Sequence, residues 1–151
     1  MLALVRPGAW NLPLFLHVLG ATLAFGSIAT VAIVGFAGHR ADADRALWLR
    51  GLAFRIALVA VVPAWLLMRV AGQWIDGKEY PNGNEPGWVG VGFLVSDVGA
   101  LVIIVLLIVA WLARRSAESR LAIVVPWLAA LYGVALGVAW FAMSGKPGGS
   151  G

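Results

Sequence analysis

The sequence lacks cysteine and has few charged residues. None of its 151 residues is a cysteine, which excludes disulfides, thiolate metal sites and cysteine nucleophiles. Only 12% of the residues are charged, whereas 62% are hydrophobic. A soluble domain has about 25% charged and about 45–50% apolar residues. Seven acidic and eleven basic side chains are too few to cover a soluble fold, so we expect lipid to be the main solvent of this chain.

Signatures of catalysis and of nucleic-acid binding are also missing. The chain has no G-x-S-x-G, no phosphate-binding loop, no H-E-x-x-H and no paired carboxylates on one helix. Asp76, Glu79 and Glu85 lie in one segment without the spacing of a calcium loop. The net charge is +4, and the arginines cluster in two short segments, which is typical of membrane orientation. The sequence therefore favours a protein without enzymatic activity, and we predict neither a metal site nor nucleic-acid binding.

Four long apolar runs occupy most of the chain, at about 10–37, 51–75, 88–113 and 121–143. Each is longer than the about 20 residues that a helix needs to cross a bilayer. The runs lack the alternation of barrel strands, so we predict helices. The expected fold is all-α: one membrane domain over residues 1–151, built as a four-transmembrane-helix up-and-down bundle. Loops at 38–50 and 114–120, an acidic middle loop and a flexible tail at 144–151 complete it.

Lysine and arginine indicate how this bundle is oriented. One set of loops carries Arg40, Arg45, Arg50, Arg114, Arg115 and Arg120. The opposite side carries only Arg6, Lys78 and Lys146. Because cytoplasmic loops are enriched in these residues, we expect loops 38–50 and 114–120 in the cytoplasm and both termini outside. The expected location is the plasma membrane of a bacterium, with the lipid bilayer as the first partner.

Two charged residues interrupt the apolar runs, Arg69 in the second and Asp97 in the third. Helix geometry places Arg69 about 21–28 Å from Arg55 and Arg50, and Asp97 about 25 Å from Arg114. Both therefore lie at the same depth in the outer half of the bundle. Either charge alone in hydrocarbon costs at least about 2.5–3.5 kcal/mol. We expect the two to pair, or to share a hydrated pocket in the bundle interior. The alternative for Arg69 is snorkelling to the headgroups.

Other polar residues reach the same depth. Trp65, Arg69 and Gln73 follow one another at helical spacing, and His17 begins a helix face of small residues. That face continues through Gly20, Ala24, Ser27, Val31 and Gly35. Small residues allow membrane helices to approach closely, which puts His17 on a packed face. The sequence thus predicts a polar cluster of His17, Arg69, Gln73 and Asp97. Alternatively, His17 is an interfacial histidine bonded to a backbone carbonyl or water.

The segment HVLGATLAFG, which begins at His17, resembles the first helix of several small bacterial membrane families. They include copper-resistance-D-like domains, membrane-bound protoporphyrinogen-oxidase-like proteins and uncharacterised integral membrane proteins. The resemblance covers these ten residues and, loosely, the four-helix layout. In the haem-linked family the first-helix histidine is a haem ligand, which implies His17 as an axial ligand of haem b. Because His39 lies at the other end of the helix, Met68 or Met143 would have to supply the opposite ligand.

Three functions follow from these features. The first is a non-enzymatic accessory or structural subunit of a larger membrane complex, with a protein partner or a second copy beside it. The second is a small oligomeric transporter or proton-coupled carrier, in which Asp97 accepts the proton and Arg69 favours its charged form. The third is the haem-binding redox protein that the resemblance implies. The ion pair could also be only a structural link between two helices.

Overall fold

The computed structural model of the protein describes residues 11–83, 85–116 and 118–145, and every regular element in them is helical. The prediction of an all-α fold is therefore confirmed for these residues. The long helices are α1 (Asn11–Arg40), α2 (Ala43–Ile56), α3 (Val62–Glu79), α4 (Gly87–Ala113) and α5 (Val124–Gly145). Two short elements complete them, the π-helical turn η2 (Ala57–Val61) and the 3₁₀ turn η3 (Arg120–Ile123).

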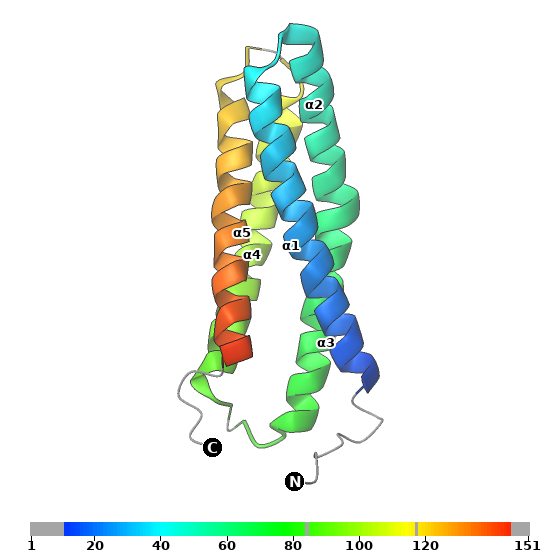
Figure 1. Ribbon diagram of the computed structural model, residues 1–151, viewed down its shortest axis with the longest axis vertical. Helices are drawn as coiled ribbons and strands as arrows, with labels where there is room; N and C mark the ends of the chain where they lie inside the picture. The colour runs from blue at the N-terminus through cyan, green and yellow to red at the C-terminus, as the bar shows by residue number, and fades with distance from the viewer. Residues whose placement is uncertain (1–10, 84, 117, 146–151) are drawn as a thin grey trace.

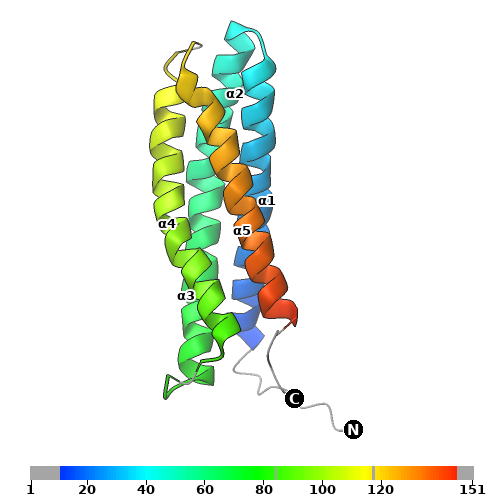
Figure 2. The same ribbon diagram turned by 90° about the vertical axis from the view of Figure 1, so that its left-hand side faces the viewer.

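The helices form four antiparallel rods, because α2, η2 and α3 continue into one another without a break (Figures 1 and 2). All four are long and apolar enough to cross a membrane. One end of the bundle carries the connection from α1 to α2 and the connection from α4 to η3, and we call it the arginine-rich end. The other end carries the start of α1, the connection from α3 to α4 and the last turn of α5. We call it the terminal end; it is at the bottom of Figure 1.

The second rod begins earlier than the sequence analysis predicts. Its first residue is Ala43 instead of residue 51, so most of the predicted loop 38–50 is helical. The cause is Asp42, whose side-chain oxygen accepts a hydrogen bond from the backbone N–H of Arg45 at 3.1 Å. A carboxylate at this position satisfies a free N–H group of the first turn and interacts favourably with the helix dipole. Arg50, predicted as a loop residue, therefore lies in α2.

The other boundaries shift less. α1 continues to Arg40 and α3 to Glu79, so these two helices extend beyond the predicted ends at 37 and 75. Ser144 and Gly145, which were predicted to begin a flexible tail, belong to the last turn of α5. The Ser144 hydroxyl donates to the carbonyl of Trp140 at 2.7 Å. Residue 10 and residues 146–151 of the predicted tail lie outside the described residues.

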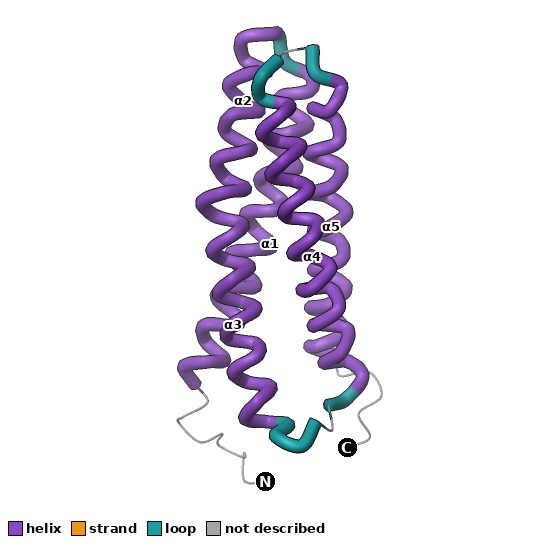
Figure 3. The backbone as a smooth tube through the Cα atoms, turned by 180° about the vertical axis from the view of Figure 1, so that it is seen from behind, coloured by secondary structure: helices purple, strands orange, loops and turns teal. Residues whose placement is uncertain are grey.

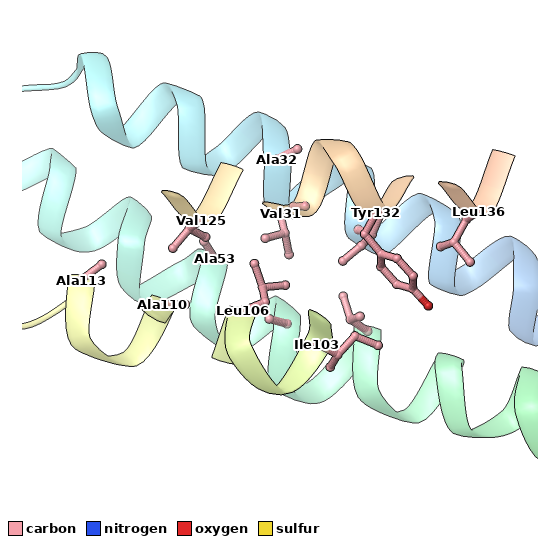
Figure 4. Close-up of a cluster of buried hydrophobic side chains, with 14 of the residues drawn as sticks. Val31, Ala32, Ala53, Ile103, Leu106, Ala110, Ala113, Val125, Tyr132 and Leu136 are labelled. Atoms are coloured by element: carbon pink, nitrogen blue, oxygen red, sulfur yellow. The ribbon is translucent and has the colours of Figure 1, made fainter. Parts of the chain in front are cut away.

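The centre of the bundle is packed with branched and small side chains (Figure 4). Ile28, Val31, Val61 and Leu106 are almost completely buried. Around them lie alanines from every rod: Ala24, Ala53, Ala57, Ala110, Ala113 and Ala129. Small side chains let helix backbones come close, which replaces the hydrophobic driving force that is missing in lipid. The predicted small-residue face of α1 is confirmed, because Gly20, Ala24, Val31 and Gly35 are buried and Ser27 is half-buried.

Pro63 has a visible effect on the second rod. A proline has no N–H and its ring clashes with the carbonyl four residues earlier, so a regular α-helix cannot pass through it undisturbed. The helix responds with the wider turn η2, in which the N–H of Val62 bonds to the carbonyl of Ala57. Such single π-turns often accommodate this kind of conflict within a long helix. Pro126 lies in the first turn of α5, where a proline is tolerated, and its ring packs against Gly35.

The direction of the second rod differs on the two sides of η2. α2 packs against both α1 and α4, whereas α3 packs mainly on α1 and approaches α4 at few points. Figure 3 shows the consequence: α3 and α4 separate towards the terminal end. Near the terminal end, side chains connect α3 to α4, and these side chains belong to the candidate site.

Candidate functional site

Arg69 on α3 and Asp97 on α4 form an ion pair. The Nε of Arg69 donates to Oδ1 of Asp97 at 2.8 Å. The guanidinium also lies over the ring of Phe93, 4.8 Å from its centre, in a cation–π contact. A charged hydrogen bond and an aromatic face together hold the planar Arg69 head in one orientation. The pairing that the equal depths predict is thus present in the structure.

The two members of the pair differ in exposure. The Arg69 side chain is 21% exposed, whereas that of Asp97 is 59% exposed. Asp97 therefore lies on the outer surface of the bundle, on the side of α4 that carries exposed Leu94 and Leu101. The prediction of a site in the interior is right for Arg69 and wrong for Asp97. The reason is that α4 turns its small residues Ser96 and Gly99 inwards, which leaves Asp97 at the edge that faces outwards.

His17 lies on the packed side of α1, and its Nδ1 is 2.8 Å from the backbone carbonyl of Met68 on α3. Because a carbonyl can only accept, Nδ1 carries the proton in this contact. The other ring nitrogen, Nε2, makes no hydrogen bond to the described residues. The alternative of a histidine bonded to a backbone carbonyl is therefore the one the structure supports.

Two glycines make this contact possible. A Cβ on Gly20 would be 2.5 Å from the Met68 nitrogen and 2.9 Å from its Cα, so α1 approaches the α3 backbone directly. A Cβ on Gly72 would be 3.0 Å from the His17 Nδ1, so this glycine leaves room for the ring. The tight contact between α1 and α3 thus depends on one glycine from each helix.

Gln73 does not join the predicted cluster. It is exposed, whereas the neighbouring Gly72 faces His17. Each step of four residues turns a helix by about 40° beyond a full circle, so Gln73 is rotated by about 80° from Trp65. Trp65 itself is directed towards α4, where its indole N–H donates to the Ser96 carbonyl at 3.1 Å.

A cavity of about 320 Å³ lies at the terminal end, between all four rods, and we call it the terminal cavity. Its charged lining residues are Arg69, Asp76 and Glu79, and His17 also lines it. Its aromatic lining residues are Phe25, Tyr80, Trp88, Phe93 and Trp140. Cavities of this size and apolar character are typical of small-molecule sites. Asp97 and Gln73 are not among the lining residues.

Two polar side chains in this wall were not predicted from the sequence as site residues. Ser96 is 5% exposed, and its hydroxyl has no hydrogen-bond partner among the described residues. Asp76 is half-buried and has one carboxylate oxygen that is buried without a partner. No sequence signal points to Ser96, because a serine in an apolar helix usually bonds to the carbonyl four residues earlier. Asp76 lies just after the predicted end of the second apolar run, in the acidic middle loop, but α3 continues past it to Glu79.

The residues present do not fit haem well. His17 has the free Nε2 that an axial ligand needs, and Met68 and Met143 line the same cavity. Met68 is bonded to His17 through its own carbonyl, so it lies on the same wall and cannot bind from the opposite side. The Met143 sulfur packs against Gly92 of α4. The acidic residues Asp76 and Glu79 would also repel propionates. No group of three or more His, Asp or Glu side chains within the described ranges could hold a metal ion.

Comparison with protein-family models, with curated proteins and with solved structures found no match to this chain. The functional argument therefore rests on the geometry of the ion pair and of the terminal cavity. The resemblance of the segment around His17 to haem-linked and copper-related families stays a prediction.

Proposed function

We propose that this chain is a bacterial plasma-membrane protein and works as a non-enzymatic accessory subunit of a larger membrane complex. In this proposal the arginine-rich end faces the cytoplasm and both termini face outwards. Four helices of spanning length and the uneven distribution of lysine and arginine support the orientation. The partner is another membrane protein or a second copy of this chain.

One observation carries the proposal, the exposure of Asp97. Its side chain is 59% exposed on a helix that is otherwise apolar at this surface. The neighbouring Leu94 and Leu101 are each 65% exposed. In a bilayer, this surface would leave a carboxylate against lipid, at a cost that pairing with Arg69 reduces but does not remove. A partner helix that covers the ion pair would bring polar groups to it, and such contacts are how membrane helices associate.

The carrier hypothesis is second. It needs Asp97 on an interior pathway, where a proton could reach it from one side of the membrane. The carboxylate lies outside the lining of the terminal cavity and is bonded to Arg69 on the outer surface. An outward-facing Asp97 fits a contact with a partner protein, whereas a proton pathway would need the carboxylate in the interior.

Photo-crosslinking in native membranes tests the proposal. A benzophenone amino acid is placed at Leu94 or Leu101, beside Asp97, and as matched controls at Ile33 on α1 or Val134 on α5. These controls are similarly exposed, at 69% and 66%. We expect a defined protein adduct from the Leu94 or Leu101 position only. Its mass distinguishes a second copy from a different protein.

The adduct should weaken when Asp97 is changed to Asn. Equal yields at all four positions, or adducts with lipid alone, would contradict a partner at the ion pair. The haem hypothesis has its own check: a Soret band in the purified protein that disappears in His17→Ala would support it.

A further inference from the structure

We propose that the terminal cavity binds a lipophilic organic cation with an aromatic body, and that Asp76 supplies the opposite charge. This site is separate from the outer surface that carries the proposed partner contact. It is formed by the chain alone, so its test does not depend on a partner.

The cavity has the size and the wall of a binding site. Its volume of about 320 Å³ is near the lower end of the range for small-molecule sites, roughly 300–1,000 Å³. A second hollow, between the helices nearer the arginine-rich end, measures about 10 Å³, too little for more than a single water molecule. The lining comes from all four rods and is predominantly apolar. A ligand of one or two fused rings would fit in it.

Aromatic rings line the wall where a flat cation would lie. Trp140 and Phe25 meet edge to face with their ring centres 6.2 Å apart, which joins α5 to α1 across the cavity. Trp88 lines the wall from the start of α4. A cation is attracted to the faces of such rings, and more strongly where water is excluded. The structure already contains one example, because the Arg69 guanidinium lies over Phe93.

The charges of the lining decide the sign of the ligand. The charge of Arg69 is paired with that of Asp97, Nε to Oδ1 at 2.8 Å, although the Arg69 Nη1 is buried without a partner in the described residues. The other charged side chains of the wall are the carboxylates of Asp76 and Glu79, and the His17 Nδ1–H is already donated to the Met68 carbonyl. Asp76 Oδ1 is buried and has no partner in the described residues. A buried carboxylate oxygen without a partner is costly, and a cation beside it would remove that cost.

Ser96 gives a second polar contact at the inner part of the cavity. The other helical hydroxyls, such as those of Thr22, Ser27 and Thr30, bond to the carbonyl four residues earlier. The Ser96 hydroxyl does not, although it is 5% exposed and lines the cavity. It is therefore available to a polar substituent on the far side of the ligand ring.

Three probes of nearly equal shape separate charge from size. They are 1-methylquinolinium, which is a cation, 1-methylnaphthalene, which is its neutral counterpart, and 1-naphthoate, which is an anion. Equilibrium dialysis against the detergent-solubilised full chain measures their saturable binding. We expect the cation to bind most tightly, by about tenfold or more over the neutral probe, because the counter-charge acts in a poorly screened site.

Matched variants locate the binding. Asp76→Asn should weaken the cation by about tenfold and leave the neutral probe unchanged, while Asp44→Asn, at the exposed start of α2, should change neither. Ala139→Phe fills the cavity from α5 and should abolish saturable binding. Val138→Phe places the same ring on the outer surface, where Val138 is 57% exposed, and should retain it.

Size-exclusion elution and helical circular dichroism establish that each variant is folded. The proposal is overturned if folded wild-type chain binds none of the probes saturably. It is equally overturned if the anion or the neutral probe binds as tightly as the cation, or if Asp76→Asn has no effect. A failure here leaves the crosslinking result at Leu94 and Leu101 untouched, since that contact lies on a different surface.

Discussion

The two halves of the bundle contain the same four rods but differ in how closely the rods approach one another. In the half near the arginine-rich end, the hollow between the helices measures about 10 Å³. In the half near the terminal end it measures about 320 Å³. The change occurs at η2, where α2 gives way to α3 and the second rod moves away from α4. The difference shows that one wide turn before Pro63 separates a closed half from an open one.

The arginines of the closed half help to hold it together. Arg50 is 9% exposed and donates to the Ser116 carbonyl at 2.7 Å, which ties α2 to the end of α4. Arg114 lies over Phe54, with its guanidinium carbon 4.6 Å from the ring centre. The charges that indicate orientation therefore also close this end of the bundle. In the open half, the charged groups line a cavity or lie at the surface.

The largest effect is expected from a substitution at the close backbone contact between α1 and α3 in the open half. Gly20→Val should destabilise the protein by about 3 kcal/mol, because the new side chain meets the Met68 backbone and not a movable side chain. Gly26→Val is the matched control, since a Cβ at Gly26 has no neighbour within 4 Å. Reversible unfolding in mixed detergent measures both. Equal losses in the two variants would show that α1 and α3 are not in close contact.

Breaking the link at the closed end is expected to be somewhat milder. Arg50→Met keeps most of the apolar stem but removes the charged donor to the Ser116 carbonyl. The expected loss is about 2 kcal/mol, as for a charged hydrogen bond whose partner is left unpaired. Arg45→Met, at an exposed position of the same helix, should cost little. If the Arg45 variant lost as much stability, the arginines would act by their charge and not by this contact.

A smaller effect is expected from the ion pair that bridges the two diverging helices. In a double-mutant cycle with Arg69→Gln and Asp97→Asn, we expect a coupling energy of about 1 kcal/mol, in the range measured for polar contacts between membrane helices. Unfolding of the wild type, the two single variants and the double variant provides it. Additive effects would show that the pair does not connect α3 to α4 in the membrane.

The smallest loss of stability is expected from removing the hydrogen bond between Trp65 and Ser96, near the boundary between the two halves. Trp65→Phe keeps an aromatic ring but removes the indole N–H that bonds to the Ser96 carbonyl. We expect a loss of about 0.5–1 kcal/mol, the usual contribution of one neutral hydrogen bond. Trp48→Phe serves as the control, because Trp48 is 65% exposed. A larger loss for the control would contradict the bridging role of Trp65.

Much of the fold could be predicted from the sequence because four apolar runs of membrane-spanning length leave few alternatives to a helical bundle. Each helix must be long enough to span, so equal depths could be assigned to Arg69 and Asp97, and they do pair. Depth does not specify rotation about the helix axis, and this is why Asp97 was expected inside. The same limitation explains why Gln73 does not join the predicted cluster: it has the predicted depth, but its side chain is exposed.

The start of the second rod has a local sequence signal, but the polar character of the segment around it favours a different prediction. The segment from Asp42 to Arg45 contains a capping residue followed by an acidic first turn, and this predicts a helix start inside the expected loop. The position of this polar segment between two apolar runs instead favours a loop. The cavity had no signal of this kind. It arises because α3 and α4 diverge after η2, and no single residue type predicts this divergence.

The second rod is longer than the hydrocarbon layer of a bilayer is thick. The rod Ala43–Glu79 contains 37 residues, about 55 Å of helix, whereas the hydrocarbon layer is about 30 Å thick. If the bundle spans a bilayer, no moderate tilt absorbs such an excess, so part of the rod lies in the headgroup region. Trp48 is 65% exposed there, between arginines, and can anchor at that interface. A change in bilayer thickness would then change how many residues of the rod lie outside the hydrocarbon layer.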